Sequence, residues 1–463
     1  MNFRKTLVLL AVLIGLLAVV LFFDSRGAKK KAAEEKTNTL IDLKATDVQK
    51  VSLLRGAETV TLEREGDGPW RLTAPLQAAA DTYEAGSLVD ALASLRIERV
   101  VEKEGKDPAA YEIPKIEADI WVKGKDAPVR LLVGMENPLD KSLFAKRADD
   151  PRIVLLASTL KSTLEKPVLD LREKSVFKFT AADVQKVRVR AKDIAWEADR
   201  AAAGWFLKTP VAALAEKTKI DSLLDSLSGL RATAFAAEEK TPAALKEFGL
   251  EKPDYEVALA LPASNQEIVF TLHKQGEKQY AASSLATKII AFEGTLLADL
   301  DRKVDDLREK KVSDLTAWDA KRVTVRRDGT EIAAAKEKVG EEEKWLLDPA
   351  AKVEADGTKV EDFVRKIEGL EAAAFIDKPG PLADYGLAPG IEVRVLTRDY
   401  QNTEKETVLF IGREDPEKKQ VVVKNAALDY LFRVDAAFLQ DLPKEKKNWQ
   451  AAAPKPEEKT DKK

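Results

Sequence analysis

The chain has 463 residues, of which 45% are hydrophobic and 33% charged, with 76 basic and 79 acidic side chains and a net charge of −3. This length accommodates about three domains of roughly 150 residues, and the near-neutral charge argues against a nucleic-acid partner. There is no cysteine and one histidine, His273. The composition therefore excludes disulfides, thiolate chemistry and Cys/His zinc sites, and we expect neither a metal nor a cofactor.

The first feature in chain order is an uncharged apolar run from Leu7 to Phe23, which follows Arg4 and Lys5. As a helix, this run would be roughly 26 Å long, near the ~30 Å thickness of a hydrocarbon core. We expect residues 1–23 to form a signal-anchor transmembrane helix, with residues 7–23 in the membrane. A cleaved signal peptide is the alternative, although the apolar region of such peptides usually has only about 7–15 residues.

The flanks of the apolar run do not favour one orientation, because basic residues lie on both sides of it. Arg4 and Lys5 precede the run, whereas Arg26 and residues 29–31 (KKK) follow it. A short basic amino terminus that leads directly into an apolar run has the form of an export signal. We therefore expect an extracytoplasmic body, joined to the anchor by a charged linker at residues 24–44.

A unit of about 136 residues occurs three times in the body of the chain. Residues 45–51 (ATDVQKV) reappear as 181–187 (AADVQKV) and, more loosely, as 319–323 (DAKRV). In each copy a tryptophan, a leucine-rich helical stretch and an aromatic-centred tripeptide then follow in the same order. This periodicity predicts repeats at 45–180, 181–316 and 317–449, and a disordered Pro/Lys/Glu-rich tail at 450–463.

Within one copy the hydrophobic period changes from strand to helix and back. Val48, Val51 and Leu53, followed by Val60 and Leu62, predict half-buried strands, and a third is expected at residues 70–72. In the first copy a stripe at Leu88, Leu92 and Leu95 predicts a helix, and its counterpart in the second copy runs from Ile220 to Leu230. Further strands are expected at 118–122, 129–133, 143–146 and 153–156, and a short helix at 159–166. The pattern predicts an α+β fold of three tandem repeats, each a mainly antiparallel sheet with one or two packed helices.

This order of elements resembles the bacterial domain-of-unknown-function family 4340. The residues that carry the resemblance are Trp70, Trp205 and Trp345, each in a Trp-x-Leu strand, and the turns at 248–250 (FGL) and 385–387 (YGL); the first copy departs from this pattern at residues 112–113 (EI). The resemblance covers residues 45–449. It implies association with ABC-type exporters of the gliding-motility class. In a bacterium, the expected anchor and extracytoplasmic body correspond to the inner membrane and the periplasm. The resemblance supplies no catalytic residues.

Three sets of residues are candidate sites. His273 lies on a predicted strand, and catalysis by it would need an orienting carboxylate and a nucleophile; a strand-end histidine is the simpler interpretation. The three tryptophans lie among apolar residues, which favours core packing over glycan stacking. Asp47, Asp183 and Asp319 are each followed three residues later by a basic residue, and we interpret them as part of a turn before a strand, in which the carboxylate bonds backbone N–H groups.

The other polar patterns in the sequence do not indicate an active site. Adjacent acids such as 305–306 (DD) are expected by chance among 79 acidic residues, and no complete phosphate-binding glycine loop is present. The leading hypothesis is a membrane-anchored, non-enzymatic scaffold or accessory subunit of an ABC-type exporter. A module that binds envelope polysaccharide or peptide is the alternative, and a carboxylate-dependent hydrolase is the third possibility.

Overall fold

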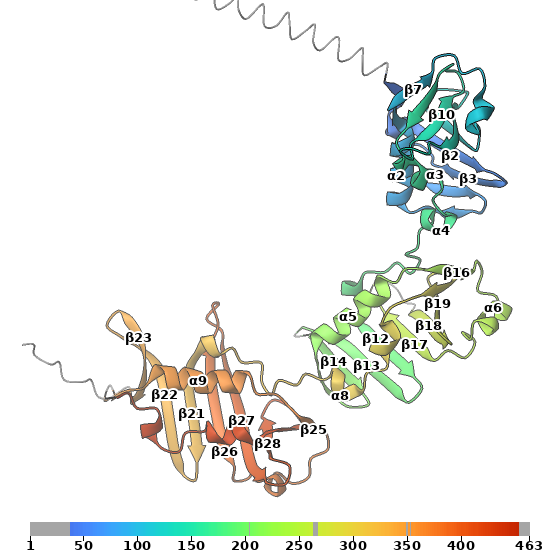
Figure 1. The fold of residues 1–463 in the computed structure, drawn as a ribbon. Coiled ribbons are helices and arrows are strands. Elements are labelled where there is room, and N and C mark those ends of the chain that lie inside the picture. The colour runs from blue at the N-terminus through green and yellow to red at the C-terminus, as the bar shows by residue number, and fades with distance from the viewer. Residues whose placement is uncertain (1–37, 203, 263–266, 349–350, 352, 453–463) are drawn as a thin grey trace, which may run out of the picture. The chain divides into compact units, whose positions relative to one another are not determined.

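The computed structural model describes residues 38–202, 204–262, 267–348, 351 and 353–452. The chain divides into two compact units. One holds the residues up to Val176 together with Arg231–Ala234, and the other holds Phe177–Leu230 and the residues from Phe235 onward. Within the described residues there are three nine-stranded sheets and one two-stranded sheet (Figure 1), and the central strands of each large sheet pair in antiparallel fashion.

The first nine-stranded sheet has the strand order β5-β4-β3-β2-β8-β9-β10-β11-β7. Its strands are β2 (Val48–Arg55), β3 (Glu58–Glu63), β4 (Arg71–Ala74), β5 (Ala78–Ala79), β7 (Arg99–Glu102), β8 (Ile116–Val122), β9 (Val129–Glu136), β10 (Leu143–Arg147) and β11 (Ile153–Leu156). Its helices are α2 (Thr82–Ala93), α3 (Thr159–Leu164) and α4 (Val168–Leu171). A separate pair is formed by β1 (Thr39–Asp42) and β6 (Ser94–Arg96).

The second sheet repeats this order as β15-β14-β13-β12-β17-β18-β19-β20-β16. Its strands are β12 (Lys186–Ala191), β13 (Ile194–Ala201), β14 (Gly204–Thr209), β15 (Ala213–Ala215), β16 (Ala234–Ala237), β17 (Tyr255–Ala260), β18 (Ile268–Gln275), β19 (Lys278–Ser283) and β20 (Ile289–Phe292). Its helices are α5 (Lys217–Ser228), α6 (Pro242–Glu247), α7 (Leu296–Leu300) and α8 (Val304–Leu307).

The third sheet has the same order again, β24-β23-β22-β21-β26-β27-β28-β29-β25. Its strands are β21 (Ala320–Arg327), β22 (Thr330–Val339), β23 (Glu342–Asp348), β24 (Val353–Glu354), β25 (Ala374–Ile376), β26 (Ile391–Arg398), β27 (Glu404–Asp415), β28 (Gln420–Asn425) and β29 (Leu431–Asp435). Its long helix is α9 (Gly357–Glu368).

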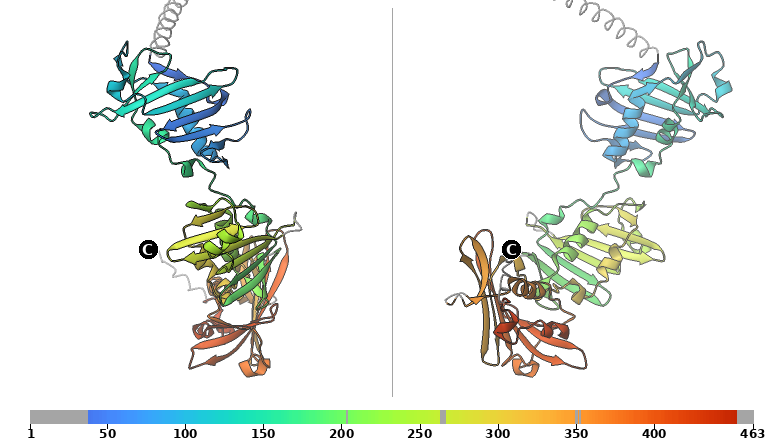
Figure 2. Two further views of the ribbon diagram at one scale, coloured as in Figure 1. Left: turned by 90° about the vertical axis from the view of Figure 1, so that its right-hand side faces the viewer. Right: turned by 60° about the vertical axis from the view of Figure 1, so that its left-hand side comes forward.

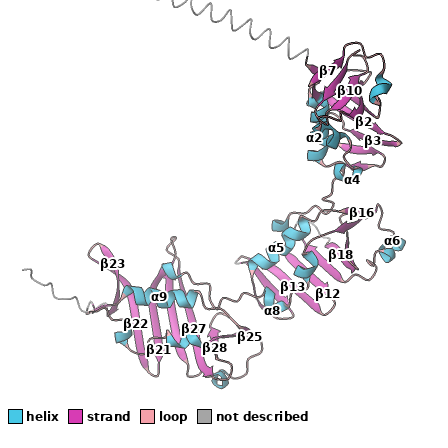
Figure 3. Cartoon of the chain, viewed as in Figure 1, coloured by secondary structure: helices cyan, strands magenta, loops and turns pink. Residues whose placement is uncertain are grey.

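The main core of each repeat lies between one face of the sheet and the long helix. In the third repeat, Val323 and Val395 on the central strands and Val360 and Ile367 of α9 are all fully or almost fully buried. The helix lies across β21 and β22 (Figure 1), and helices lie along one face of the magenta sheets in Figure 3. The right-hand view of Figure 2 shows α2 in front of the strands of the first sheet. Alternating residues in each strand thus bury one face, as the period of two predicts.

A smaller apolar cluster lies on the opposite face of each sheet, beneath the segment that carries the aromatic tripeptide. In the second repeat it comprises Leu250, Tyr280, Ala282 and Ile289, with Phe248 packed against them. The first and third repeats have equivalent clusters around Tyr111 and Tyr385. The aromatic tripeptide therefore packs on this smaller cluster and covers it on the second face of the sheet.

Much of the predicted fold is confirmed, and some of its details are corrected. The structure is mainly antiparallel sheet with few helices, as expected, but α2 ends at Ala93 and Leu95 lies in strand β6 instead of on the helix. The helices of the later repeats end directly before Gly229 and Gly369, because glycine disfavours continuation of a helix.

Two terminal predictions concern regions near the limits of the described residues. No helix in the described part of the chain is long and apolar enough to span a membrane, and the anchor predicted at 7–23 lies outside that part. Residues 39–42, which the sequence analysis assigns to the linker, form strand β1, in which Leu40 and Ile41 are buried against the first repeat.

Candidate functional site

The candidate site is the place where the aromatic turn meets the second strand that follows it, which is β9, β18 or β27. Strand register identifies the equivalent residues: Ile116 pairs with Val133, Tyr255 with Leu272, and Ile391 with Ile411. The next residue along the second strand is therefore the same position in all three repeats. That position is occupied by Gly134, His273 and Gly412.

In the first and third repeats the turn backbone packs directly on this glycine. A Cβ atom built on Gly134 would lie 2.1 Å from the Tyr111 carbonyl oxygen, and one on Gly412 would lie 2.1 Å from the Tyr385 carbonyl oxygen. No side chain fits at such a distance. The glycines are thus required by close approach of the aromatic turn to the strand.

In the second repeat the strand carries a side chain at this position, and the glycine lies in the turn instead. Its strand carries His273, and its turn carries Gly249 with φ +72°, where an added Cβ would lie 2.2 Å from the imidazole Cδ2. The imidazole Nδ1 lies 2.9 Å from a carboxylate oxygen of Asp254, which also accepts a hydrogen bond from the Lys274 backbone N–H. The histidine is wedged between the turn and this carboxylate.

A tyrosine–carboxylate contact lies on the opposite face of the same sheet, because Tyr255 pairs with Leu272, the strand neighbour of His273. The Tyr255 hydroxyl donates to Asp301 at 2.8 Å, and burial, with the hydrogen bond and charge of Asp301, raises the pKa of Tyr255 to about 12. Within the described residues the imidazole has no hydrogen bond to a hydroxyl group that could serve as a nucleophile. The Asp254–His273 pair is an orienting contact without the third member of a triad.

Hollows open beside the glycine position in the other two repeats. In the third repeat the hollow has a volume of about 1160 Å³ and is lined by Gly386, Gly412 and Arg413, among others. In the first repeat a smaller hollow of about 270 Å³ is lined by Glu112 and Gly134, and also by residues of β10 and α3 such as Leu143 and Lys161. A concave site thus recurs at one place in the fold, and its polar lining differs between repeats.

The three tryptophans are buried and each lies under a cation. The Arg64 guanidinium carbon is 4.6 Å from the Trp70 ring centre, and the Arg200 carbon is 4.3 Å from that of Trp205. In the third repeat, Lys336 Nζ is 5.4 Å from the centre of the Trp345 ring. These distances are within the range of cation–π attraction.

An acid from the long helix completes this arrangement in two repeats. Trp205 Nε1 donates to Asp221 at 2.9 Å, and Trp345 Nε1 donates to Glu361 at 3.2 Å. Burial acts to raise the pKa of Glu361, but hydrogen bonds from Trp345 and Lys336 outweigh it, and that pKa lies below its ordinary value. In the first repeat Gly86 stands at the corresponding helix position, so the acid is missing there.

Asp47, Asp183 and Asp319 each end a short 3₁₀ turn before a central strand, with two residues between Asp183 and strand β12. None of their carboxylates accepts a hydrogen bond from a described residue, so the carboxylate-to-backbone bond we expected is not formed. In the first two repeats the turn is instead held by the arginine that covers the tryptophan. Arg64 Nε donates to the Val48 carbonyl at 2.9 Å, and Arg200 Nε to the Val184 carbonyl at 2.8 Å.

The structure shows charged residues that sequence reasoning missed. Arg64 and Arg200 recur shortly before a tryptophan, and this spacing was the available signal for their role. Arg413 follows Gly412 directly, but nothing in the sequence placed Lys419 and Lys444 on the same hollow. Among the described residues no group of three or more His, Asp or Glu side chains is arranged to hold a metal ion.

Comparison with known proteins defines the class of protein. The model of a domain of unknown function, DUF4340, matches residues 19–112, 70–243, 205–387 and 345–461. The chain belongs to this family, as its tandem units suggested. Three of the matches begin at Trp70, Trp205 and Trp345, the tryptophans of the three repeats. No curated protein and no solved structure matches the chain.

Proposed function

We propose that this protein is a membrane-anchored, non-enzymatic scaffold or accessory subunit that partners an ABC-type exporter. The observation that supports this most directly is which side chains recur. Buried tryptophans, their covering cations and the aromatic turn are present in all three repeats. In contrast, the residue that follows Gly134, His273 or Gly412 differs in each repeat and is Met135, Lys274 or Arg413. Repetition of the core and its covering cations, without repetition of the side chain beside the strand glycine or histidine, fits a repeated framework better than a repeated active site.

The proposed location is the bacterial inner membrane, with the segment 7–23 as a single-pass anchor and the body in the periplasm. A topology reporter fused after Lys463 tests it. Reporter activity outside the cytoplasm is the expected result, and activity inside it would refute this orientation.

Co-purification tests the proposed partnership. The full chain, tagged at its carboxyl terminus and extracted from native membranes in mild detergent, should bring down the membrane and nucleotide-binding subunits of an exporter. A matched sample of the same chain with residues 7–23 replaced by a heterologous transmembrane helix separates contacts of the body from contacts of the anchor. Absence of transporter subunits from both samples would refute the partnership.

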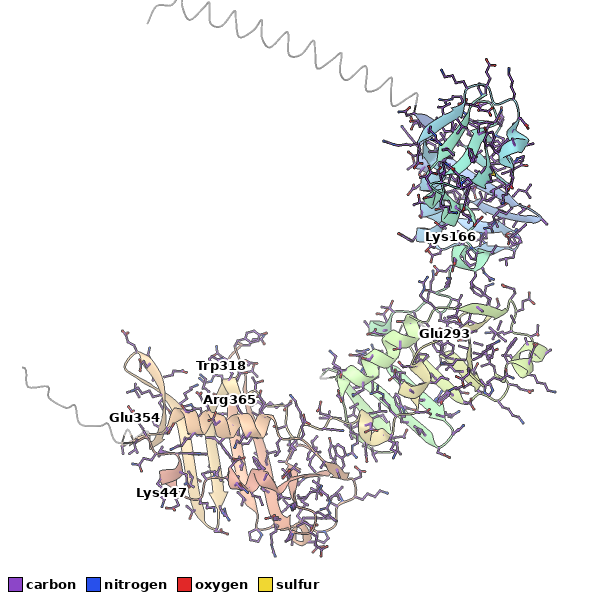
Figure 4. The ribbon with its side chains drawn as sticks, viewed as in Figure 1. Lys166, Glu293, Trp318, Glu354, Arg365 and Lys447 are labelled. Atoms are coloured by element: carbon purple, nitrogen blue, oxygen red, sulfur yellow. The ribbon has the colours of Figure 1, made fainter. Side chains whose placement is uncertain are left out.

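An envelope-glycan module is the second candidate, and one observation favours it. Trp318 and Tyr400 are 88% and 90% exposed, and the pairing of Ala320 with Thr397 places them at the same end of the third sheet. Figure 4 labels Trp318 above α9. Exposed aromatic rings with polar neighbours such as Gln401, whose amide donates to the Tyr400 hydroxyl, suit stacking on sugar rings.

Binding to purified envelope polysaccharide tests this candidate. Trp318→Ala combined with Tyr400→Ala should abolish retention of the full chain on immobilised polysaccharide, because both stacking surfaces are removed. Tyr83→Ala, at an exposed aromatic residue of the first repeat, is the matched control and should bind normally. Equal retention of all three proteins would exclude the two rings as the glycan site.

A further inference from the structure

We propose that the hollow of the third repeat binds an acidic, partly apolar peptide segment of a partner protein. We call this hollow the third-repeat groove. Its walls are the β21–β22 hairpin at 326–329, the aromatic turn at 386–392, the β27–β28 hairpin at 411–419 and the segment 435–444. The inference builds on the accessory role proposed above and adds the chemistry of one contact.

The size of the groove favours a chain segment over a small molecule. Its volume of about 1160 Å³ exceeds the roughly 300–1,000 Å³ typical of small-ligand pockets. A second hollow of about 450 Å³ shares Gln440, Leu442 and Lys444 with it and reaches α9. Two adjoining hollows with a common wall can accommodate consecutive side chains of an extended segment.

The charge of the groove selects an acidic ligand. Arg326 and Arg327 are already paired with acids, at 2.8 Å with Glu331 and at 3.4 Å with Asp328. In contrast, Arg413, Lys419 and Lys444 line the groove without an ion pair to any described residue. Glu414 and Asp435 also line the groove without an ion pair to a described residue, so three such cations stand against two such carboxylates. The remaining excess of positive charge favours acidic side chains in a ligand.

The other lining residues favour a peptide over a sugar polymer. Pro389, Ile391, Leu439 and Leu442 contribute apolar surface to the groove, which suits aliphatic side chains between the acids. No aromatic ring is among the residues that line it, so it lacks the flat stacking surface that favours sugar rings.

The backbone holds Arg413 in place before any ligand arrives. A β-bulge interrupts the β27–β28 register between Ile411 and Glu414, and bulges commonly re-aim a side chain. The Arg413 stem then packs against the turn, since a Cβ added to Gly386 would lie 2.7 Å from Arg413 Cγ. A cation fixed in this way loses less conformational freedom on binding.

Fluorescence anisotropy with a defined probe tests the inference. The probe is a fluorescein-labelled peptide of about twelve residues in which Glu and Leu alternate, added to the full chain in neutral detergent at low ionic strength. Arg413→Glu/Lys419→Glu/Lys444→Glu should weaken binding by about tenfold or more, because three charge pairs become repulsive. The matched control Lys192→Glu/Lys246→Glu/Lys252→Glu changes the net charge equally at exposed lysines of the second repeat and should weaken binding less than twofold.

Several outcomes would overturn the inference. They are no binding by the unaltered chain, equal losses in the two triple variants, equal binding of a peptide with Lys in place of Glu, or preferential binding of the anionic polysaccharide polygalacturonate. Circular dichroism of each variant checks that it is folded, and Arg413→Gln alone provides a milder change with a smaller expected loss. The measurement uses no transporter, so its failure is distinguishable from failure of co-purification.

Discussion

Replacing Gly412 by alanine is expected to destabilise the third repeat by about 3 kcal/mol, at the upper end of the usual cost of overpacking. The new methyl group would lie 2.1 Å from the Tyr385 carbonyl oxygen. That oxygen belongs to a tight turn in which the Gly386 and Leu387 N–H groups donate to Ala383 and Leu382, so it cannot withdraw without breaking the turn. Urea unfolding followed by tryptophan fluorescence should show an earlier transition for the third repeat.

The second repeat supplies the control at the same register. His273→Ala keeps the Cβ that is already accommodated there, and it removes only the partly exposed imidazole and its contact with Asp254. Its expected cost is about 1 kcal/mol. Gly134→Ala should repeat the large effect in the first repeat, where the opposing atom is the Tyr111 carbonyl oxygen. A Gly412→Ala transition that coincides with that of the unaltered chain would show that the turn yields to the methyl group.

The glycine position shows how far sequence reasoning reaches. The alternation of apolar residues predicted the central strands, and the repeat placed His273 near Gly134 and Gly412. The reason for glycine was not predictable, because it depends on a carbonyl group some twenty residues away along the chain that approaches the strand only in the folded sheet. Sequence patterns report which face a residue occupies, but they do not report which atom faces it across the packed layer.

The outer edges of the sheets were beyond prediction for a related reason. Strands β7, β16 and β25 come shortly after the long helix in the chain, yet each pairs with the last strand of its sheet instead of with a sequence neighbour. They are short, and β25 has only Ala374, Phe375 and Ile376. Segments this short carry almost no periodic signal, and their pairing is decided by contacts between distant parts of the chain.

Arg308 is a buried charged residue whose role was not predicted from the sequence. The closing motif Leu-Arg-Glu-Lys recurs at 171–174 and 307–310, and an arginine there reads as a surface residue because arginine is rarely fully buried. Arg308 is nonetheless 0% exposed. Its guanidinium lies 2.7 Å from Asp377 and 3.6 Å above the Phe375 ring centre, with Tyr430 at 4.8 Å.

Replacing Arg308 by alanine should therefore lower the free energy of unfolding of the second unit by about 2–5 kcal/mol, the range for truncating a large buried side chain to alanine. The change leaves a cavity between Phe375 and Tyr430 and removes the cation from both rings. Equilibrium urea unfolding of the full chain measures the effect, and the transition of the first unit, which does not contain these residues, serves as the internal reference.

Arg308→Met separates the contribution of volume from that of charge. Methionine fills most of the arginine's space and contacts aromatic rings favourably, and replacement of a buried charge by a well-packed apolar group is often neutral or stabilising. Asp377 is partly exposed, so water can solvate its carboxylate once the cation is gone. We expect a loss of less than about 1.5 kcal/mol for Arg308→Met. If methionine proved as damaging as alanine, the charge itself and not the packing of the side chain would hold this segment in place.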